Sequence, residues 1–288
     1  MTESVDRFWS SRDGLTLHFR DFAGREDRPP VICLHGLTRN ARDFESLARR
    51  LAGEWRVLCP EMRGRGDSAY AKDSATYNPL QYVEDLGELL AQQGIDRFVA
   101  VGTSLGGLMT ILTAMATPER LAGAVLNDIG PYVETQGLRR IASYVGQGRS
   151  YPTWMHAARD LADLQGAAHP GWAVVDWLAA AKRLMTLSSN GRIVFDYDMK
   201  IAEPFVGMDV EHQPDLWPGI DALAGKPVAL IRGALSDLLS AATLDTMQRR
   251  LPGAEAVTLA DVGHAPTLDE PEAVAAIDRL LAKIAAGA

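Results

Sequence analysis

Cysteine is scarce in this chain of 288 residues, which contains only Cys33 and Cys59. Each lies in a short apolar run, VICL or RVLC, of the kind that forms a buried strand. We therefore expect two buried, reduced thiols and no disulfide framework. This cysteine usage is also typical of a protein in a reducing compartment.

Positive charge is in deficit. The chain has 29 Lys and Arg against 37 Asp and Glu, a formal net charge of −8. The longest runs of consecutive basic residues are pairs such as Arg139-Arg140 and Arg249-Arg250. A nucleic-acid binder needs a basic surface to neutralise phosphates. We therefore expect a small-molecule substrate and no nucleic-acid partner.

Long hydrophobic runs are missing as well. The longest apolar stretch, residues 105–116, contains two glycines and two threonines and is too short to cross a bilayer. The first residues, MTESVDRFWSS, lack the apolar core of a secretion signal. We expect a cytoplasmic protein with no membrane partner, and its oligomeric state stays open.

The sequence does contain a regular alternation of short apolar runs and helical patterns. Such alternation predicts a mostly parallel sheet with helices on both faces. The first two predicted strands have no helix between them, so we expect them to form an antiparallel edge. The predicted strands are 15–22, 30–34, 56–59, 98–101, 122–126, 228–231 and 256–259, and the predicted helices are 43–51, 79–93, 105–117, 241–250 and 271–286.

The alternation lapses after Asn127 and resumes at Val228. Between them lie helical patterns, four of the six tryptophans and several prolines, with no buried-strand run. We therefore predict a core of residues 1–130 and 220–288 and a mainly helical insertion of residues 131–219.

One motif carries most of the chemical information. Gly102-Thr103-Ser104-Leu105-Gly106 stands between a predicted buried strand and a predicted helix, the context that a G-x-S-x-G nucleophile turn requires. Ser104 is the candidate nucleophile, since a serine at such a turn projects at the positive end of a helix. A serine hydroxyl needs a base within hydrogen-bond reach, and His264 follows the last predicted strand.

Together with His35-Gly36-Leu37, the Arg63-Gly64-Arg65-Gly66-Asp67-Ser68 turn and Gly263-His264-Ala265-Pro266, this motif resembles the α/β-hydrolase superfamily. The resemblance covers most of the chain and implies an eight-stranded, mostly parallel sheet with a helical cap inserted after the sixth strand. It also implies an oxyanion hole formed by the backbone N–H groups of Leu37 and Leu105. A serine at the turn argues against the epoxide hydrolases and haloalkane dehalogenases of this fold, which carry aspartate there. No metal or organic cofactor is implied.

Two aspartates can orient His264, because each follows the carboxyl end of a predicted strand. We favour Asp237 over the alternative acid, Asp128, since the usual chain order is serine, acid, histidine with the acid late. His35 is the rival base, although bracing its own loop is the better interpretation of that residue. Aromatic residues of the insertion are candidate pocket residues: Tyr144, Trp154, Trp172, Trp177 and Trp217.

These residues predict a serine hydrolase that cleaves a small to medium, partly apolar ester or lactone through an acyl-enzyme. A hydrolase of carbon–carbon bonds would use the same three side chains, so the motifs leave that alternative open. A non-catalytic ligand-binding protein on this fold is the third alternative.

Overall fold

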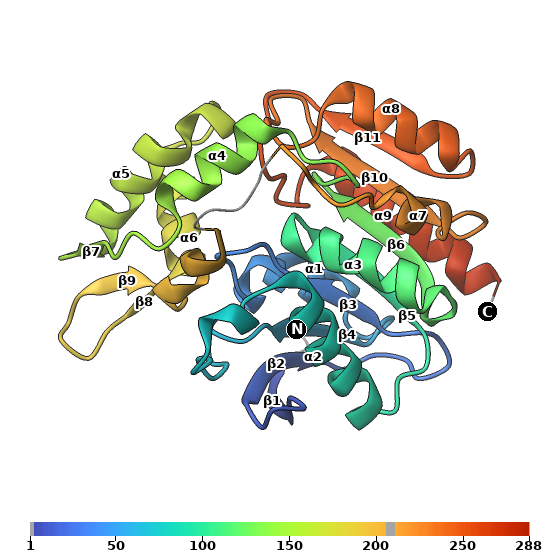
Figure 1. The fold of residues 1–288 in the computed structure, drawn as a ribbon, viewed down its shortest axis with the longest axis horizontal. Helices are drawn as coiled ribbons and strands as arrows, with labels where there is room; N and C mark the ends of the chain where they lie inside the picture. The colour runs from blue at the N-terminus through green and yellow to red at the C-terminus, as the bar shows by residue number, and fades with distance from the viewer. Residues whose placement is uncertain (1–2, 206–210, 288) are drawn as a thin grey trace.

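The computed structural model describes residues 3–205 and 211–287, and it is built around an eight-stranded sheet (Figure 1). The strand order is β1-β2-β4-β3-β5-β6-β10-β11. In chain order these strands are β1 (Val5–Ser10), β2 (Thr16–Phe22), β3 (Val31–Leu34), β4 (Val57–Glu61), β5 (Phe98–Thr103), β6 (Leu121–Asn127), β10 (Val228–Gly233) and β11 (Glu255–Leu259).

The sheet is parallel except at one edge. β1 pairs antiparallel with β2, β2 pairs antiparallel with β4, and the remaining pairs are parallel. The predicted mostly parallel sheet is therefore confirmed, but the predicted pairing at the edge is wrong. β2 lies beside β4 rather than β3, and the outermost strand is β1, which is not among the strands predicted from the sequence. Only Trp9 of β1 is buried, so this strand lacks the alternation that reveals a half-buried strand.

Helices cover both faces of the sheet, as predicted. Alternate residues of β3 point to opposite faces: Ile32 and Leu34 join one apolar core, and Val31 and Cys33 join the other. The first core includes side chains of α2 (Pro79–Gln92), α3 (Leu105–Ala116), α7 (Trp217–Asp221) and α8 (Ala241–Arg250). The second includes side chains of α1 (Glu45–Leu51) and α9 (Pro271–Ala286). Both cysteines are free and buried in the second core.

Residues 135–195, which lie between β6 and β10, form a lobe beside the sheet (Figure 1). Its own apolar core, centred on Leu161, Trp177 and Leu184, is built by α5 (Trp154–Gln165) and α6 (Val174–Leu184) with strand residues. The sequence predicts a mainly helical insertion, and α4 (Thr135–Tyr144) is a third helix. The structure adds a three-stranded sheet of β7 (Ser150–Tyr151), β9 (Ile193–Phe195) and β8 (Met185–Leu187).

Helix α7 spans the predicted end of the insertion at residue 219. Ile220 of α7 is buried with α3, and a side chain on Gly219 would overlap Ile111 of that helix. α7 therefore packs with the helices that cover the sheet. The division into core and cap at residues 131–219 remains a proposal.

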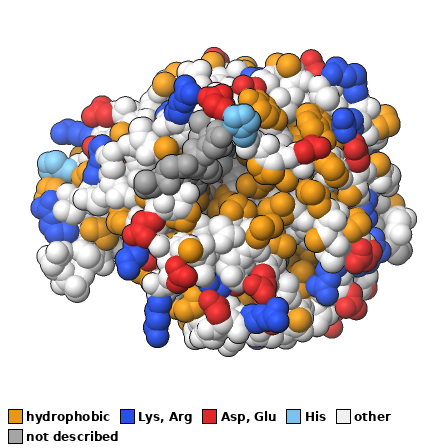
Figure 2. Space-filling view, viewed as in Figure 1, with side chains coloured by type: hydrophobic (Ala, Val, Ile, Leu, Met, Phe, Trp, Pro, Cys, Tyr) orange, Lys and Arg blue, Asp and Glu red, His pale blue; other side chains and the backbone are white. Residues whose placement is uncertain are grey.

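Charged side chains of both signs are interspersed over the face shown in Figure 2, and apolar side chains gather near α3. Within residues 3–205 and 211–287, no helix combines the length and the hydrophobicity needed to cross a membrane.

Close packing of α3 against the sheet leaves no room for side chains at two glycines of the G-x-S-x-G motif. A Cβ atom on Gly106 would overlap the carbonyl group of Leu34 in β3, and one on Gly102 would overlap the backbone of Gly106. Because backbone atoms cannot move aside as a flexible side chain can, these two glycines fix the approach of α3 to β5.

We predict that Gly106→Ala lowers the free energy of unfolding by about 1–3 kcal/mol, the usual cost of overpacking. Gly87→Ala is the matched control, because Gly87 lies in α2 with open space around its Cβ position. That substitution should raise stability by about 0.5–1 kcal/mol through helix propensity. Urea denaturation measures both, and equal effects of the two substitutions would contradict this packing argument.

Candidate active site

Ser104 lies on a strained turn between β5 and α3. Its backbone angles are φ 53° and ψ −115°, and a non-glycine residue rarely adopts a positive φ. Strain of this kind costs about 1–3 kcal/mol and persists only where the surroundings impose it. Here the N–H of Ser104 donates to the carbonyl of Asn127 at 3.1 Å, which ties the turn to the end of β6.

His264 reaches Ser104 from the loop that follows β11. The Ser104 Oγ lies 3.0 Å from Nε2 of His264. Asn127 holds this loop in place, since its Nδ2 donates both to the carbonyl of Pro266 at 2.9 Å and to Thr103 Oγ1 at 3.0 Å. Residues separated by 160 positions in the sequence thus form one hydrogen-bonded pair at the sheet edge.

The carboxylate beside His264 belongs to Asp128, the residue that directly follows β6. Its Oδ2 lies 2.8 Å from Nδ1 of His264 and also accepts from Ser236 Oγ at 2.6 Å, while Oδ1 accepts from the Gly233 N–H at 2.9 Å. The side chain is fully buried, and these three donors compensate a charge that would otherwise be costly to bury. An acceptor at Nδ1 puts the proton there and leaves Nε2 able to accept the proton of Ser104.

The structure places the favoured acid, Asp237, elsewhere. Its carboxylate forms a bidentate ion pair with Arg140 of α4, at 2.5 and 2.8 Å. Burial opposes ionisation of Asp237, but Arg140 and the charge of His264 hold its pKa below the usual value. The strand-end aspartate that contacts His264 is therefore Asp128, the alternative. The neighbour of Asp237, Ser236, is the residue of this turn that reaches Asp128.

The loop after β3 lies against the Ser104 turn. Gly36 and Leu37 line the same pocket as Ser104 and His264. The backbone N–H groups of Leu37 and Leu105 donate to no acceptor among the described residues. Leu105 is the first residue of α3, where N–H groups have no partner within the helix. Both N–H groups are therefore candidates for binding an oxygen atom.

His35 braces this loop, as the sequence analysis prefers. Its Nε2 accepts from the Met62 N–H at 3.0 Å, so Nδ1 carries the proton and donates to the Gly36 carbonyl at 2.7 Å. Burial, reinforced by the charge of Arg65, lowers the pKa of His35 to about 4 and keeps the ring neutral. It makes no hydrogen bond with Ser104, which leaves His264 as the base candidate.

The glycine-rich turn after β4 supports the same loop. The guanidinium of Arg65 is buried and donates from Nε to the carbonyl of Leu37 at 2.9 Å. Its Nη1 donates to the carbonyl of Arg63 at 2.7 Å. Arg63 is itself buried and paired with Asp85 and Asp13. The turn predicted from the sequence thus anchors Leu37 in place.

A pocket of about 400 Å³ opens over Ser104 and His264. Of the five aromatic candidates from the insertion, Tyr144 and Trp172 line it. Trp177 and Trp154 instead pack in the insertion's own core, and Trp217 lies under the guanidinium of Arg250. The pocket is also lined by cationic side chains and by His169, none of which is among the site residues predicted from the sequence. No sequence motif marks these residues, because the topology alone brings them to the site.

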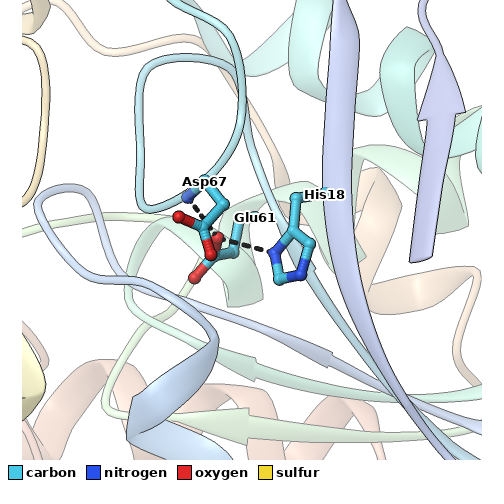
Figure 3. Close-up of side chains that lie close together, drawn as sticks. All are labelled: His18, Glu61 and Asp67. Atoms are coloured by element: carbon cyan, nitrogen blue, oxygen red, sulfur yellow. Dashed lines mark hydrogen bonds and ion pairs between the residues drawn. The ribbon is translucent and has the colours of Figure 1, made fainter. Parts of the chain in front are cut away.

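A second cluster of titratable side chains, His18, Glu61 and Asp67, has the proximity of a metal site (Figure 3). Two of the three side chains are already engaged: Glu61 lies 2.9 Å from His18 Nδ1 and accepts from the backbone N–H groups of Asp67 and Ala41. The other nitrogen of His18 lies 3.0 Å from Asp6. We interpret the cluster as the support of the glycine-rich turn, which packs on Glu61 through Gly66.

The strained serine turn, the histidine bonded to it and the buried acid behind that histidine together define a class, the hydrolases of the α/β fold. Comparison with known proteins gives the same answer: the model of the Alpha/beta hydrolase family matches residues 31–277. The chain therefore belongs to the α/β-hydrolase family, as the sequence resemblance implies.

Individual relatives agree with this assignment. A crystal structure of an α/β hydrolase from Novosphingobium aromaticivorans is 63% identical, covers 98% of this chain and 99% of that one, and superposes with a TM-score of 0.94. A 3-hydroxybutyrate-oligomer hydrolase of Cupriavidus necator is 32% identical over 85% of each chain. An esterase of Mycobacterium tuberculosis is 29% identical, over 87% of this chain and 82% of the relative.

We predict that Asp128→Asn lowers kcat for an ester substrate by about 10⁴-fold, because an amide favours the wrong tautomer of His264. The matched variant Asp237→Asn breaks the ion pair with Arg140 but leaves the bond to His264, so kcat should fall less than about ten-fold. Both are measured by steady-state kinetics at a temperature where circular dichroism shows a folded protein. A large loss in Asp237→Asn alone would restore the sequence-based choice.

The His18 cluster makes a prediction about stability. Burial disfavours the charged ring, but hydrogen bonds to Glu61 and Asp6 and the charge of Glu61 outweigh it and raise the pKa of His18. A raised pKa means stabilisation that is complete below the unfolded-state value, near 6.5, and lost as the pH rises through the folded-state value. His18→Gln should therefore cost more stability at pH 6 than at pH 9.

Urea denaturation of both proteins at the two pH values tests this, with the wild type as the reference at each pH. If His18→Gln lowers the free energy of unfolding by the same amount at pH 6 and at pH 9, the charge of His18 does not contribute to stability.

Proposed function

We propose that the protein is a serine hydrolase that cleaves a carboxylic ester through an acyl-enzyme. The observation that carries the proposal is the hydrogen-bonded series Ser104–His264–Asp128, in which each atom has the partner that its role needs. The relatives named as an oligomer hydrolase and an esterase support ester cleavage.

In the proposed reaction, Ser104 Oγ attacks the ester carbonyl carbon while its proton passes to Nε2 of His264. The oxyanion that forms accepts hydrogen bonds from the N–H groups of Leu37 and Leu105. Collapse of this intermediate releases the alcohol, which takes the proton from His264. Water then attacks the acyl-enzyme with His264 again accepting a proton, and the acid is released with Ser104 restored.

Each neighbour of these groups has a defined part in the proposal. Asp128 stabilises the positive charge that His264 gains and keeps the ring in the productive tautomer. Arg65 and His35 hold the loop that carries Leu37. Donors that are fixed before reaction lose nothing to reorganisation, and removing one such donor typically costs about 10²–10³ in rate.

The pocket volume of about 400 Å³ suits a small to medium substrate. Because one relative is named for the hydrolysis of 3-hydroxybutyrate oligomers, esters of short-chain acids are the first substrates to test.

Ser104→Ala should lower kcat for 4-nitrophenyl butyrate by at least about 10⁴-fold, because it removes the nucleophile but leaves the oxyanion hole and the pocket in place. Ser10→Ala is the control, because Ser10 is an exposed residue of β1. It should leave kcat unchanged. Retention of most activity in Ser104→Ala would refute the assignment.

The acyl-enzyme makes a separate prediction. 4-Nitrophenyl butyrate and phenyl butyrate share an acyl group and differ in the alcohol released. In the presence of methanol both should give the same ratio of methyl butyrate to butyrate, because one common intermediate partitions between methanol and water. Ratios that depend on the leaving group would argue for direct attack by water.

A further inference from the structure

The wall of the pocket formed by α6 and the loop after β3 is strongly basic. Five cationic side chains line the pocket, Arg39, Arg42, Arg140, Lys182 and Arg183, against three acidic ones. Two of the five are neutralised from outside the lining, Arg42 by Asp196 and Arg140 by Asp237. The other three, Arg39, Lys182 and Arg183, remain, and we refer to them as the basic wall.

The basic wall has one acid for three cations. Asp43 accepts both hydrogen bonds from Arg39, at 2.5 and 3.0 Å. Arg183 approaches the same carboxylate only to 4.0 Å, and its side chain donates no hydrogen bond within the described residues. Lys182 has no ion-pair partner in that part of the chain either. Of the other lining acids, Glu45 is paired with Arg20 and Arg49, and Asp269 is exposed on the His264 loop.

His169 adds to the same pocket a polar ring with no hydrogen-bond partner among the described residues. The ring is only 6% exposed and stacks on Trp172 with centroids 4.0 Å apart. Neither ring nitrogen has a hydrogen-bond partner in residues 3–205 or 211–287. Burial and then the positive charge of Arg39 lower its pKa to about 4. The ring is therefore neutral, and its N–H is available to an acceptor in the pocket.

The end of α6 that carries Arg183 is held against the core. The carbonyl of Arg183 accepts from Asn40 Nδ2 at 3.1 Å and from Arg42 Nε at 2.9 Å. Cations in the last turn of a helix also complement its dipole. The helix dipole therefore accounts for Lys182 and Arg183 at the carboxyl end of α6. It does not account for the position of both side chains in the lining of the pocket over Ser104.

We infer that the basic wall, with the N–H of His169, binds a carboxylate group of the substrate, so that the preferred substrates are esters that carry a free carboxylate at the far end of the acyl chain. This inference rests on the proposed function and adds the substrate class. A guanidinium that lacks a full partner suits a carboxylate because its two N–H groups match the two oxygens.

The test compares chain-matched esters. Mono-4-nitrophenyl adipate and mono-4-nitrophenyl suberate carry a terminal carboxylate, while 4-nitrophenyl hexanoate and octanoate are their neutral counterparts. The wild-type kcat/KM should be about ten-fold or more higher for the anionic member of at least one pair, the effect expected of a charge-assisted hydrogen bond.

Variants then assign the effect to residues. Arg183→Gln and Lys182→Gln together should raise KM for the anionic ester about ten-fold with little change in kcat, and should change the values for the neutral ester less than two-fold. Lys72→Gln is the control, because Lys72 is exposed and does not line the pocket. It removes one positive charge from the protein and should change neither ester.

The outcomes separate the two claims. If neither ester is hydrolysed, the proposed function fails. If the neutral ester is hydrolysed as well as the anionic one, or if the double variant affects both esters equally, the function stands and the carboxylate site is refuted.

Discussion

The carboxylate of Asp128 is buried at the junction of three segments, and the site depends on how its charge is compensated. Its three donors come from the end of β10, the turn that follows β10 and the loop that follows β11. A buried charge without partners would cost several kcal/mol, so these segments are constrained to meet there. That constraint fixes the orientation of His264. Asn127, next to Asp128, donates to Thr103 beside Ser104 and to Pro266 of the His264 loop, and so joins the Ser104 turn to that loop.

The two halves of the pocket come from different parts of the chain. The ends of the sheet strands supply Ser104, His264 and Asp128. The position of Ser104 follows from close backbone packing, because Gly106 of α3 lies against the Leu34 carbonyl of β3. The insertion supplies Arg183, His169 and Trp172. Residues of the insertion can therefore vary without disturbing the sheet ends that hold Ser104, His264 and Asp128.

Sequence reasoning found the architecture and the pair Ser104 and His264, because buried strands and a G-x-S-x-G turn leave local signals. For the acid it favours Asp237 over Asp128, whereas the carboxylate beside His264 belongs to Asp128. Asp128 and Asp237 both lie between the serine and the histidine in the chain, so chain order does not separate them. The two aspartates differ in their distance from the end of the preceding strand. Asp128 is the first residue after β6, while Asp237 lies four residues after β10 and bonds Arg140 of α4. The strand β1 and the basic wall were missed because neither has a local pattern.

A crystal structure of the protein after reaction with an alkyl phosphonate ester tests the central claim most directly. The account predicts a covalent bond from phosphorus to Ser104 Oγ. It also predicts a phosphoryl oxygen about 2.7–3.1 Å from the N–H groups of Leu37 and Leu105, and His264 still bonded to Asp128. An adduct on another residue, or an oxygen directed away from those two N–H groups, would contradict it.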